Sequence, residues 1–105
     1  MEIHTSTDNT INGDLRVAEV AELAVKNDLG HMDDWLTRVD VHLKDQNGSK
    51  KGPANIRCTI EARPRGLAPM AAHADATDIS AALKAAAVKL RARLQSEHSK
   101  RDPYR

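Results

Sequence analysis

The sequence predicts an α+β fold: a two-layer sandwich in the order β-α-β-β-β-α, with one four-stranded sheet and both helices on one face. Two patterns lead to this prediction. Apolar residues recur every three or four positions between Asp14 and Gly30 and again over residues 77–98, as in helices with one buried stripe. Elsewhere, short stretches alternate apolar and polar residues, as in strands with one buried face. The helices and the sheet therefore bury these surfaces against each other and leave the second sheet face in water.

Length and composition indicate one soluble domain. A chain of 105 residues with 40% hydrophobic content can bury a modest core. We expect residues 1–98 to form this domain and residues 99–105 to be a flexible tail. The single cysteine cannot close an internal disulfide, no apolar run is long enough to cross a bilayer, and residues 1–10 do not resemble a signal peptide. These features favour a cytoplasmic protein.

The first half of the chain predicts a strand, a helix and a connector. Residues 2–7 alternate weakly, and Asn12 or Asp14 can cap the helix that follows. Glu22 and Lys26 are four residues apart and should form an ion pair on the exposed side of this helix. The buried stripe is predicted to contain Val17, Ala18, Ala21, Ala24, Val25 and Leu29.

Trp35, the only tryptophan, lies in the connector of residues 31–35. It could stack on a nucleic-acid base or fill the core beside the next strand. The large area that an indole buries, and the adjacent Leu36, favour the core.

Three more strands are predicted over residues 37–44, 54–63 and 67–76. Pro69 lies within the last of these and places it at a sheet edge, because proline cannot donate to a neighbouring strand. Cys58 belongs to an apolar set, so we expect a buried, inert thiol. The inward positions are Val39, Val41 and Leu43 in the first of these strands and Ile56, Cys58, Ile60 and Ala62 in the second.

The last helix carries two rows of cations beside its apolar stripe. Thr77 is predicted to cap it, with Asp78 in the first turn. At 100° per residue, Lys84 and Arg91 lie on one shoulder of the stripe. On the other shoulder lie Lys89 and Arg93. The stripe itself consists of Ile79, Ala82, Leu83, Ala86, Ala87, Leu90 and Leu94.

Charge is divided unevenly along the chain. Residues 1–48 carry four Lys/Arg and ten Asp/Glu, a net charge of −6, whereas residues 49–105 carry twelve and five, a net charge of +7. If the halves stay apart in space, one surface can attract a polyanion although the total is only +1. If they interleave, the asymmetry cancels.

Catalytic and metal-binding motifs are absent from the sequence. It contains no glycine-rich phosphate loop, no HExxH, no GxSxG and no spaced Cys/His set. His4, His42 and His73 should face the open side of the sheet, but in sequential strand order His42 and His73 are two strands apart, about 10 Å. We therefore expect no enzyme activity, no metal, no cofactor and no small-molecule substrate.

Binding to RNA phosphates suits the residues better. The outward strand positions lack the aromatic platform of an RNA-recognition sheet, whereas contacts to the RNA backbone need only Lys and Arg on helices and loop tips. The candidate RNA-binding residues are Lys84, Lys89, Arg91 and Arg93 in the last helix, Lys50, Lys51, Arg63 and Arg65 in loops, and Arg16 and Lys26 in the first helix.

Three segments within the predicted order of elements resemble one family. Residues 39–45 (VDVHLKD), residues 57–64 (RCTIEARP) and residues 78–83 (DISAAL), the last leading to Leu90 and Leu94, are similar to the short ribosome hibernation-promoting factors. This family includes ribosome-associated inhibitor proteins, once described as sigma-factor modulation proteins. The resemblance spans residues 1 to about 98. It implies a domain that docks in the decoding region of the small ribosomal subunit, on the path of messenger and transfer RNA, and silences translation in stationary phase or stress. We expect the free protein to be a monomer.

The sequence departs from this family in three places. Members often have an aromatic residue at the position of Ser80, a longer basic run where residues 95–97 read QSE, and more cations in the first helix. These departures predict weaker or differently oriented binding to the ribosome. Because no second domain follows His98, the resemblance implies a short form. Two alternatives stay open: a regulator that binds a partner protein through the acidic half or the open sheet face, and a double-stranded-RNA binder outside the ribosome.

Overall fold

The computed structural model describes residues 1–8, 11, 15–47 and 52–100. The predicted order of elements, β-α-β-β-β-α, is confirmed, with one additional turn of 3₁₀ helix (η1) after the first α-helix. The elements are β1 (Glu2–Thr7), α1 (Leu15–Leu29), η1 (Gly30–Met32), β2 (Leu36–Asp45), β3 (Ile56–Pro64), β4 (Met70–Ala76) and α2 (Ile79–Lys100).

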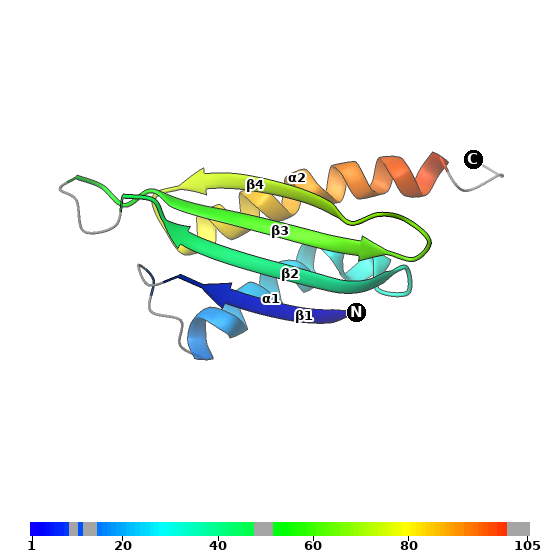
Figure 1. The fold of residues 1–105 in the computed structure, drawn as a ribbon, viewed down its shortest axis with the longest axis horizontal. Coiled ribbons are helices and arrows are strands. Elements are labelled where there is room, and N and C mark those ends of the chain that lie inside the picture. Colours follow the sequence, from blue (N-terminus) through cyan, green and yellow to red (C-terminus); the bar gives the residue numbers. More distant parts are fainter. Residues whose placement is uncertain (9–10, 12–14, 48–51, 101–105) are drawn as a thin grey trace.

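The four strands lie in the order of the sequence, and both helices cover one face of the sheet (Figure 1). β1 pairs in parallel with β2, so α1 forms the crossover between them, while β2, β3 and β4 pair as antiparallel neighbours. The β3–β4 turn and the C-terminal end of α2 lie at the same end of the molecule (Figure 1). Among the helices that the structure describes, none is long and apolar enough to cross a membrane.

The core lies between the sheet and the two helices, as the alternation of apolar residues predicts. Every predicted inward residue of β2 and β3 is buried, and α2 buries its predicted stripe except for Ile79, which is half-buried. Cys58 is a buried free thiol, and burial raises its pKa to about 12. The prediction of a buried thiol is therefore confirmed, and its raised pKa disfavours the reactive thiolate near neutral pH.

The predicted bounds of β2 and β3 differ from the structure by one or two residues, and β4 and α2 differ in three further respects. β4 is an edge strand as predicted, but it begins at Met70, after Pro69. Thr77 is not the cap of α2: the carboxylate of Asp78 accepts a hydrogen bond from the backbone N–H of Ala81 at 2.8 Å. The helix includes Ser99 and Lys100, where the sequence predicts the start of a tail, and residues 101–105 lie outside the described part of the chain.

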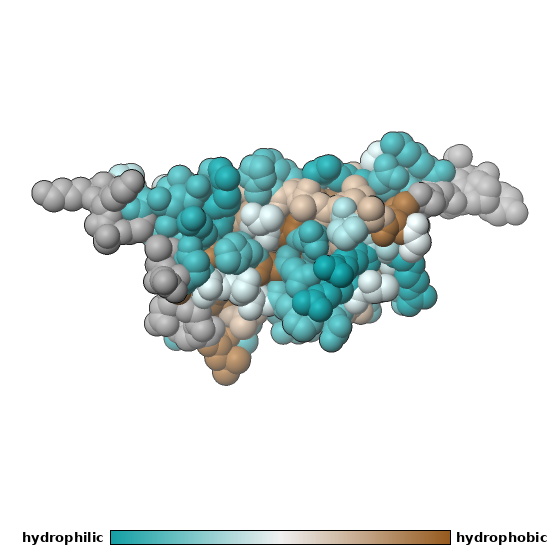
Figure 2. Space-filling model, viewed as in Figure 1, coloured by the Kyte–Doolittle hydropathy of each residue, from teal (hydrophilic) through white to brown (hydrophobic). Residues whose placement is uncertain are grey.

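The face of the sheet away from the helices is predominantly hydrophilic (Figure 2). On β2 and β3 the outward residues alternate with buried ones, as expected for strands with one face in water. The molecule therefore presents three kinds of surface to a partner: the open face of the sheet, the outer side of the two helices, and the edges of the sheet.

Candidate nucleic-acid interface

The first basic shoulder of α2 turns toward α1 and meets a buried carboxylate there. Asp28, in the last turn of α1, is only 2% exposed. Its two oxygens accept hydrogen bonds from Lys84 Nζ at 3.2 Å and from Arg91 Nη1 at 2.8 Å. The outer parts of both cations still reach solvent, because the Lys84 side chain is 65% exposed and that of Arg91 38%. This shoulder is therefore accessible but partly neutralised.

Asp28 also changes the interpretation of the charge division. It belongs to the acidic half of the chain and pairs with two cations of the basic half, so the two halves do interleave at the contact between the helices. The sequence pattern did not reveal this residue, because an Asp in the last helical turn normally faces water. Only its position in the helical repeat could have indicated burial, because Asp28 lies between Val25 and Leu29 on the buried stripe of α1.

The second basic shoulder lies along the edge of the sheet. Lys89 Nζ donates a hydrogen bond to the carbonyl oxygen of His73 at 3.0 Å, and Arg93 Nη1 donates one to the carbonyl of Ala71. Both carbonyls belong to β4, the edge strand. The two cations therefore cover polar groups that would otherwise be open to pairing with another strand.

Lys89 and Arg93 keep hydrogen-bonding capacity for a phosphate. An ammonium has three donors and a guanidinium five, and each uses one of them on a carbonyl of β4. Both side chains are exposed and border a shallow groove of about 380 Å³ between α2 and β4. Ala92, Ala71, Ala72 and His73 also line this groove. Apart from Lys89, Arg93 and His73, the side chains that line the groove are alanines, so a phosphate group can approach the two cations.

The turn between β3 and β4 presents the loop arginines. Arg65 is exposed, and its backbone N–H donates a hydrogen bond to the carbonyl oxygen of Trp35 at 2.9 Å. Arg63 lies on β3 and forms an ion pair with Glu61 at 3.6 Å, so it contributes less free positive charge than Arg65. Gly66 allows this turn because its φ of +74° is unfavourable for residues with a side chain.

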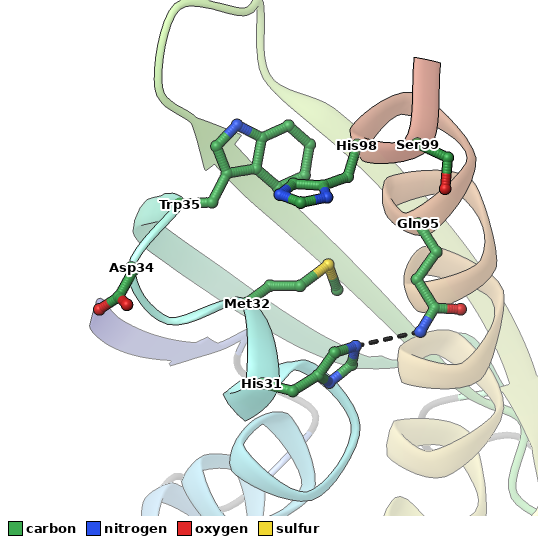
Figure 3. Close-up of a pocket in the computed structure, with 7 residues that line it drawn as sticks. All are labelled: His31, Met32, Asp34, Trp35, Gln95, His98 and Ser99. Atoms are coloured by element: carbon green, nitrogen blue, oxygen red, sulfur yellow. Dashed lines mark hydrogen bonds between the residues drawn. The ribbon is translucent and has the colours of Figure 1, made fainter. Parts of the chain in front are cut away.

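Trp35 does not fill the core as a fully buried plug. It is half-buried and packs against the core, and its ring meets that of His98 edge to face, with centroids 4.8 Å apart and planes at 74° (Figure 3). The sequence offered the core and a base-stacking surface as alternatives. The structure gives the indole one side in the core and one side toward a cavity.

The first helix adds little positive charge. Lys26 forms the predicted ion pair with Glu22 at 2.8 Å, and Arg16 is an exposed cation at the start of α1. Lys50 and Lys51 lie outside the described residues. The structure thus divides the predicted cations among the helix contact, the β4 edge and the β3–β4 turn rather than gathering them on one surface.

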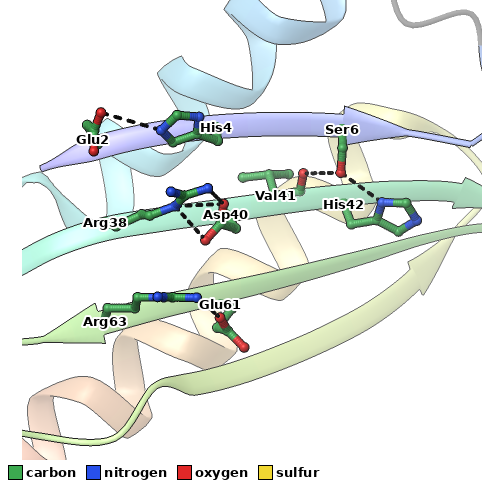
Figure 4. Close-up of polar contacts among 9 residues, drawn as sticks. All are labelled: Glu2, His4, Ser6, Arg38, Asp40, Val41, His42, Glu61 and Arg63. Carbon is green, nitrogen blue, oxygen red and sulfur yellow. Dashed lines mark hydrogen bonds and ion pairs between the residues drawn. The ribbon is translucent and has the colours of Figure 1, made fainter.

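The open face of the sheet is occupied by paired charges (Figure 4). Arg38 binds Asp40 at 2.9 Å, and Arg57 binds Asp75 at 2.8 Å. The hydrogen bond from Arg57 lowers the pKa of Asp75, and the hydrogen bond to Asp40 raises the pKa of Arg38. These arginines are therefore less available to phosphates than Lys89 and Arg93 of α2.

The histidines of the open face are separated as the sequence predicts. His42 is opposite Thr59 in β3, and Thr59 is opposite His73 in β4, so the two histidines are two strands apart. His42 Nδ1 lies 2.9 Å from Ser6 Oγ, and His4 pairs with Glu2 at 3.6 Å. Within the described residues, no group of three or more His, Cys, Asp or Glu side chains is placed to hold a metal ion.

Solved structures share this fold. A ribosomal subunit interface protein from Coxiella burnetii superposes with a TM-score of 0.77 at 12% sequence identity, over 94% of this chain and 99% of that one. The N-terminal domain of Protein Y from Thermus thermophilus gives a TM-score of 0.74 at 16% identity, over 91% of this chain and 98% of that one. Among curated protein sequences, no match was found. A family profile matches residues 9–102, and the chain therefore belongs to the sigma 54 modulation protein / S30EA ribosomal protein family.

Proposed function

We propose that the chain binds the small ribosomal subunit in its decoding region, on the path of messenger and transfer RNA, and inhibits translation in stationary phase or stress. It acts in the cytoplasm by occupying this path, without catalysis. Membership of a ribosome-associated family supports this proposal, and so does the fold shared with a ribosomal subunit interface protein.

The observation that carries the proposal is the second basic shoulder of α2. Lys89 and Arg93 are exposed, one helical turn apart, and held in place by carbonyls of β4 rather than by carboxylates. Within the described residues neither cation forms an ion pair, and both are held in an ordered position, which suits contact with a phosphate backbone.

Separate contacts to RNA are available to Lys84, Arg91 and Arg65. The first two reach solvent beyond Asp28, and Arg65 forms no ion pair within the part of the chain that the structure describes. Such contacts position a protein on RNA by shape and charge rather than by base sequence. This mode of binding suits the folded surface of ribosomal RNA.

Sedimentation of lysates from stationary cells tests the proposal. We expect the protein to migrate with small subunits or with ribosomes at low salt and to move toward the top of the gradient as salt rises, because phosphate contacts are salt-dependent. A protein that stays at the top of the gradient even at low salt would refute the proposal.

A protein partner is the second candidate, and one observation on α1 favours it. Leu15 and Leu23 are 75% and 62% exposed, two helical turns apart, with the exposed Glu19 and Glu22 nearby. Treatment of the lysate with nuclease before sedimentation separates the candidates. Co-migration that survives removal of the RNA indicates a protein partner, and its loss indicates RNA.

A further inference from the structure

A cavity of about 540 Å³ lies where the connector after α1 meets the C-terminal end of α2 (Figure 3). The β3–β4 turn lies at the same end of the molecule as this cavity. Its volume is within the range of small-ligand sites, which is about 300–1,000 Å³. The lining residues are His31, Met32, Asp34, Trp35, Gln95, His98 and Ser99.

Flat and polarizable side chains form one part of this cavity. Trp35 and His98 are in edge-to-face contact, and the thioether of Met32 lies below them in the view of Figure 3. His98 is exposed and Trp35 half-exposed, so their rings can be reached from solvent. Aromatic rings of this kind are the surfaces on which proteins stack unpaired RNA bases.

Polar groups on the opposite side can read the edge of a flat ligand. Gln95 Nε2 lies 3.0 Å from His31 Nε2, which ties the end of α2 to η1. An amide has two donors and an acceptor oxygen, so the Gln95 side chain keeps capacity for a further partner. A site that combines ring stacking with an amide suits a nucleobase, which has both a flat face and a hydrogen-bonding edge.

The charges around the cavity indicate which end of a nucleotide enters it. Asp34 is a lining residue, and its negative charge disfavours a phosphate inside. Two cations lie near this end of the molecule. Arg65 is exposed, and its backbone N–H binds the carbonyl oxygen of Trp35. Arg91 is one helical turn before Gln95 on α2 and stays 38% exposed while it binds Asp28. The base is therefore expected inside and the phosphate at the rim.

From this arrangement we propose that the cavity binds one unpaired nucleobase, stacked on the ring of His98 and in contact with Trp35, with its phosphate near Arg65 and Arg91. The inference rests on the proposed function in so far as the base belongs to ribosomal or messenger RNA. A free nucleotide offers the same chemistry, and the experiment below distinguishes the two sources.

Fluorescence of Trp35 tests the site directly, because it is the only tryptophan of the chain. The full chain is titrated with adenosine monophosphate, with a short single-stranded oligoadenylate and with a blunt RNA duplex, with excitation at wavelengths that the bases do not absorb. We expect saturable quenching by the single strand and none by the duplex. Quenching by the mononucleotide as well shows that a free nucleotide suffices, whereas quenching by the strand alone assigns the base to RNA.

Two exposed histidines provide a matched pair of variants. His98→Ala should weaken binding of the single strand about tenfold, since stacking on one ring contributes about 1–3 kcal/mol and 1.4 kcal/mol is a factor of ten. His42→Ala, on the open sheet face, should leave it unchanged. The inference would be overturned if neither the mononucleotide nor the single strand quenched Trp35, or if both variants weakened binding equally.

Sedimentation with ribosomes separates this inference from the proposed function. If the protein co-sediments with small subunits but Trp35 is never quenched, the base site is refuted and the ribosome-binding proposal stands. If Trp35 is quenched but the protein never co-sediments, the base site stands and the ribosome-binding proposal is refuted.

Discussion

Replacement of Lys84 and Arg91 together by alanine is expected to lower the free energy of unfolding by about 3 kcal/mol, because it leaves the carboxylate of Asp28 buried without a counter-charge. Either single replacement should cost much less, since the remaining cation still binds Asp28. Equilibrium unfolding in urea measures all three variants. The double variant is thus expected to be less stable than the sum of the single variants predicts.

A compensating change at Asp28 checks the cause of this loss. Asp28→Asn, added to the double variant, should recover much of the stability, because a buried neutral amide costs less than a buried unpaired charge. A double variant as stable as the original chain would show that water solvates Asp28 adequately. A triple variant no more stable than the double would place the loss in the packing of the two long side chains instead.

Replacement of Lys89 and Arg93 together by alanine is expected to weaken binding to the small subunit by on the order of 10- to 100-fold at low salt. The net contribution of a hydrogen bond in water is about 0.5–1.5 kcal/mol, so two contribute about 1–3 kcal/mol, and 1.4 kcal/mol is a factor of ten. The slope of log affinity against log salt concentration should fall by about two, one for each lost phosphate contact. The free energy of unfolding should change by less than about 1 kcal/mol, because both side chains are exposed.

A matched control removes the same charge from the open face of the sheet. Lys44→Ala with Arg57→Ala also deletes two cations, one of them paired with Asp75. We expect it to reduce binding far less. If the control weakens binding as much as the α2 variant, the effect is one of net charge, or the sheet is the interface, and Lys89 and Arg93 have no special role.

The fold could be predicted because its determinants are local and periodic. The alternation through Val39, Val41 and Leu43 and the three-and-four spacing through Leu83, Leu90 and Leu94 each fix which side of an element is buried. The boundaries were less certain, because Thr77 and Asp78 are both good caps, and only the geometry of the first turn of α2 decides between them.

The candidate site could be predicted only in part, because its residues interact across the chain. The periodicity of α2 placed Lys84 and Arg91 correctly on one shoulder, but their partner Asp28 is more than fifty residues away and no local pattern connects them. The contact of Trp35 with His98 is equally non-local. Lys89 and Arg93 were predicted as solvent-facing cations, and their hydrogen bonds to β4 follow from how α2 lies along the sheet edge.

Co-sedimentation of the purified protein with purified small ribosomal subunits, across a series of salt concentrations, tests the central claim most directly. The account predicts stoichiometric binding at low salt, a linear fall of log affinity with log salt concentration, and no displacement by an equal concentration of duplex RNA. The account would be contradicted if binding did not depend on salt. It would also be contradicted if duplex RNA displaced the protein from the subunits as effectively as added free subunits do.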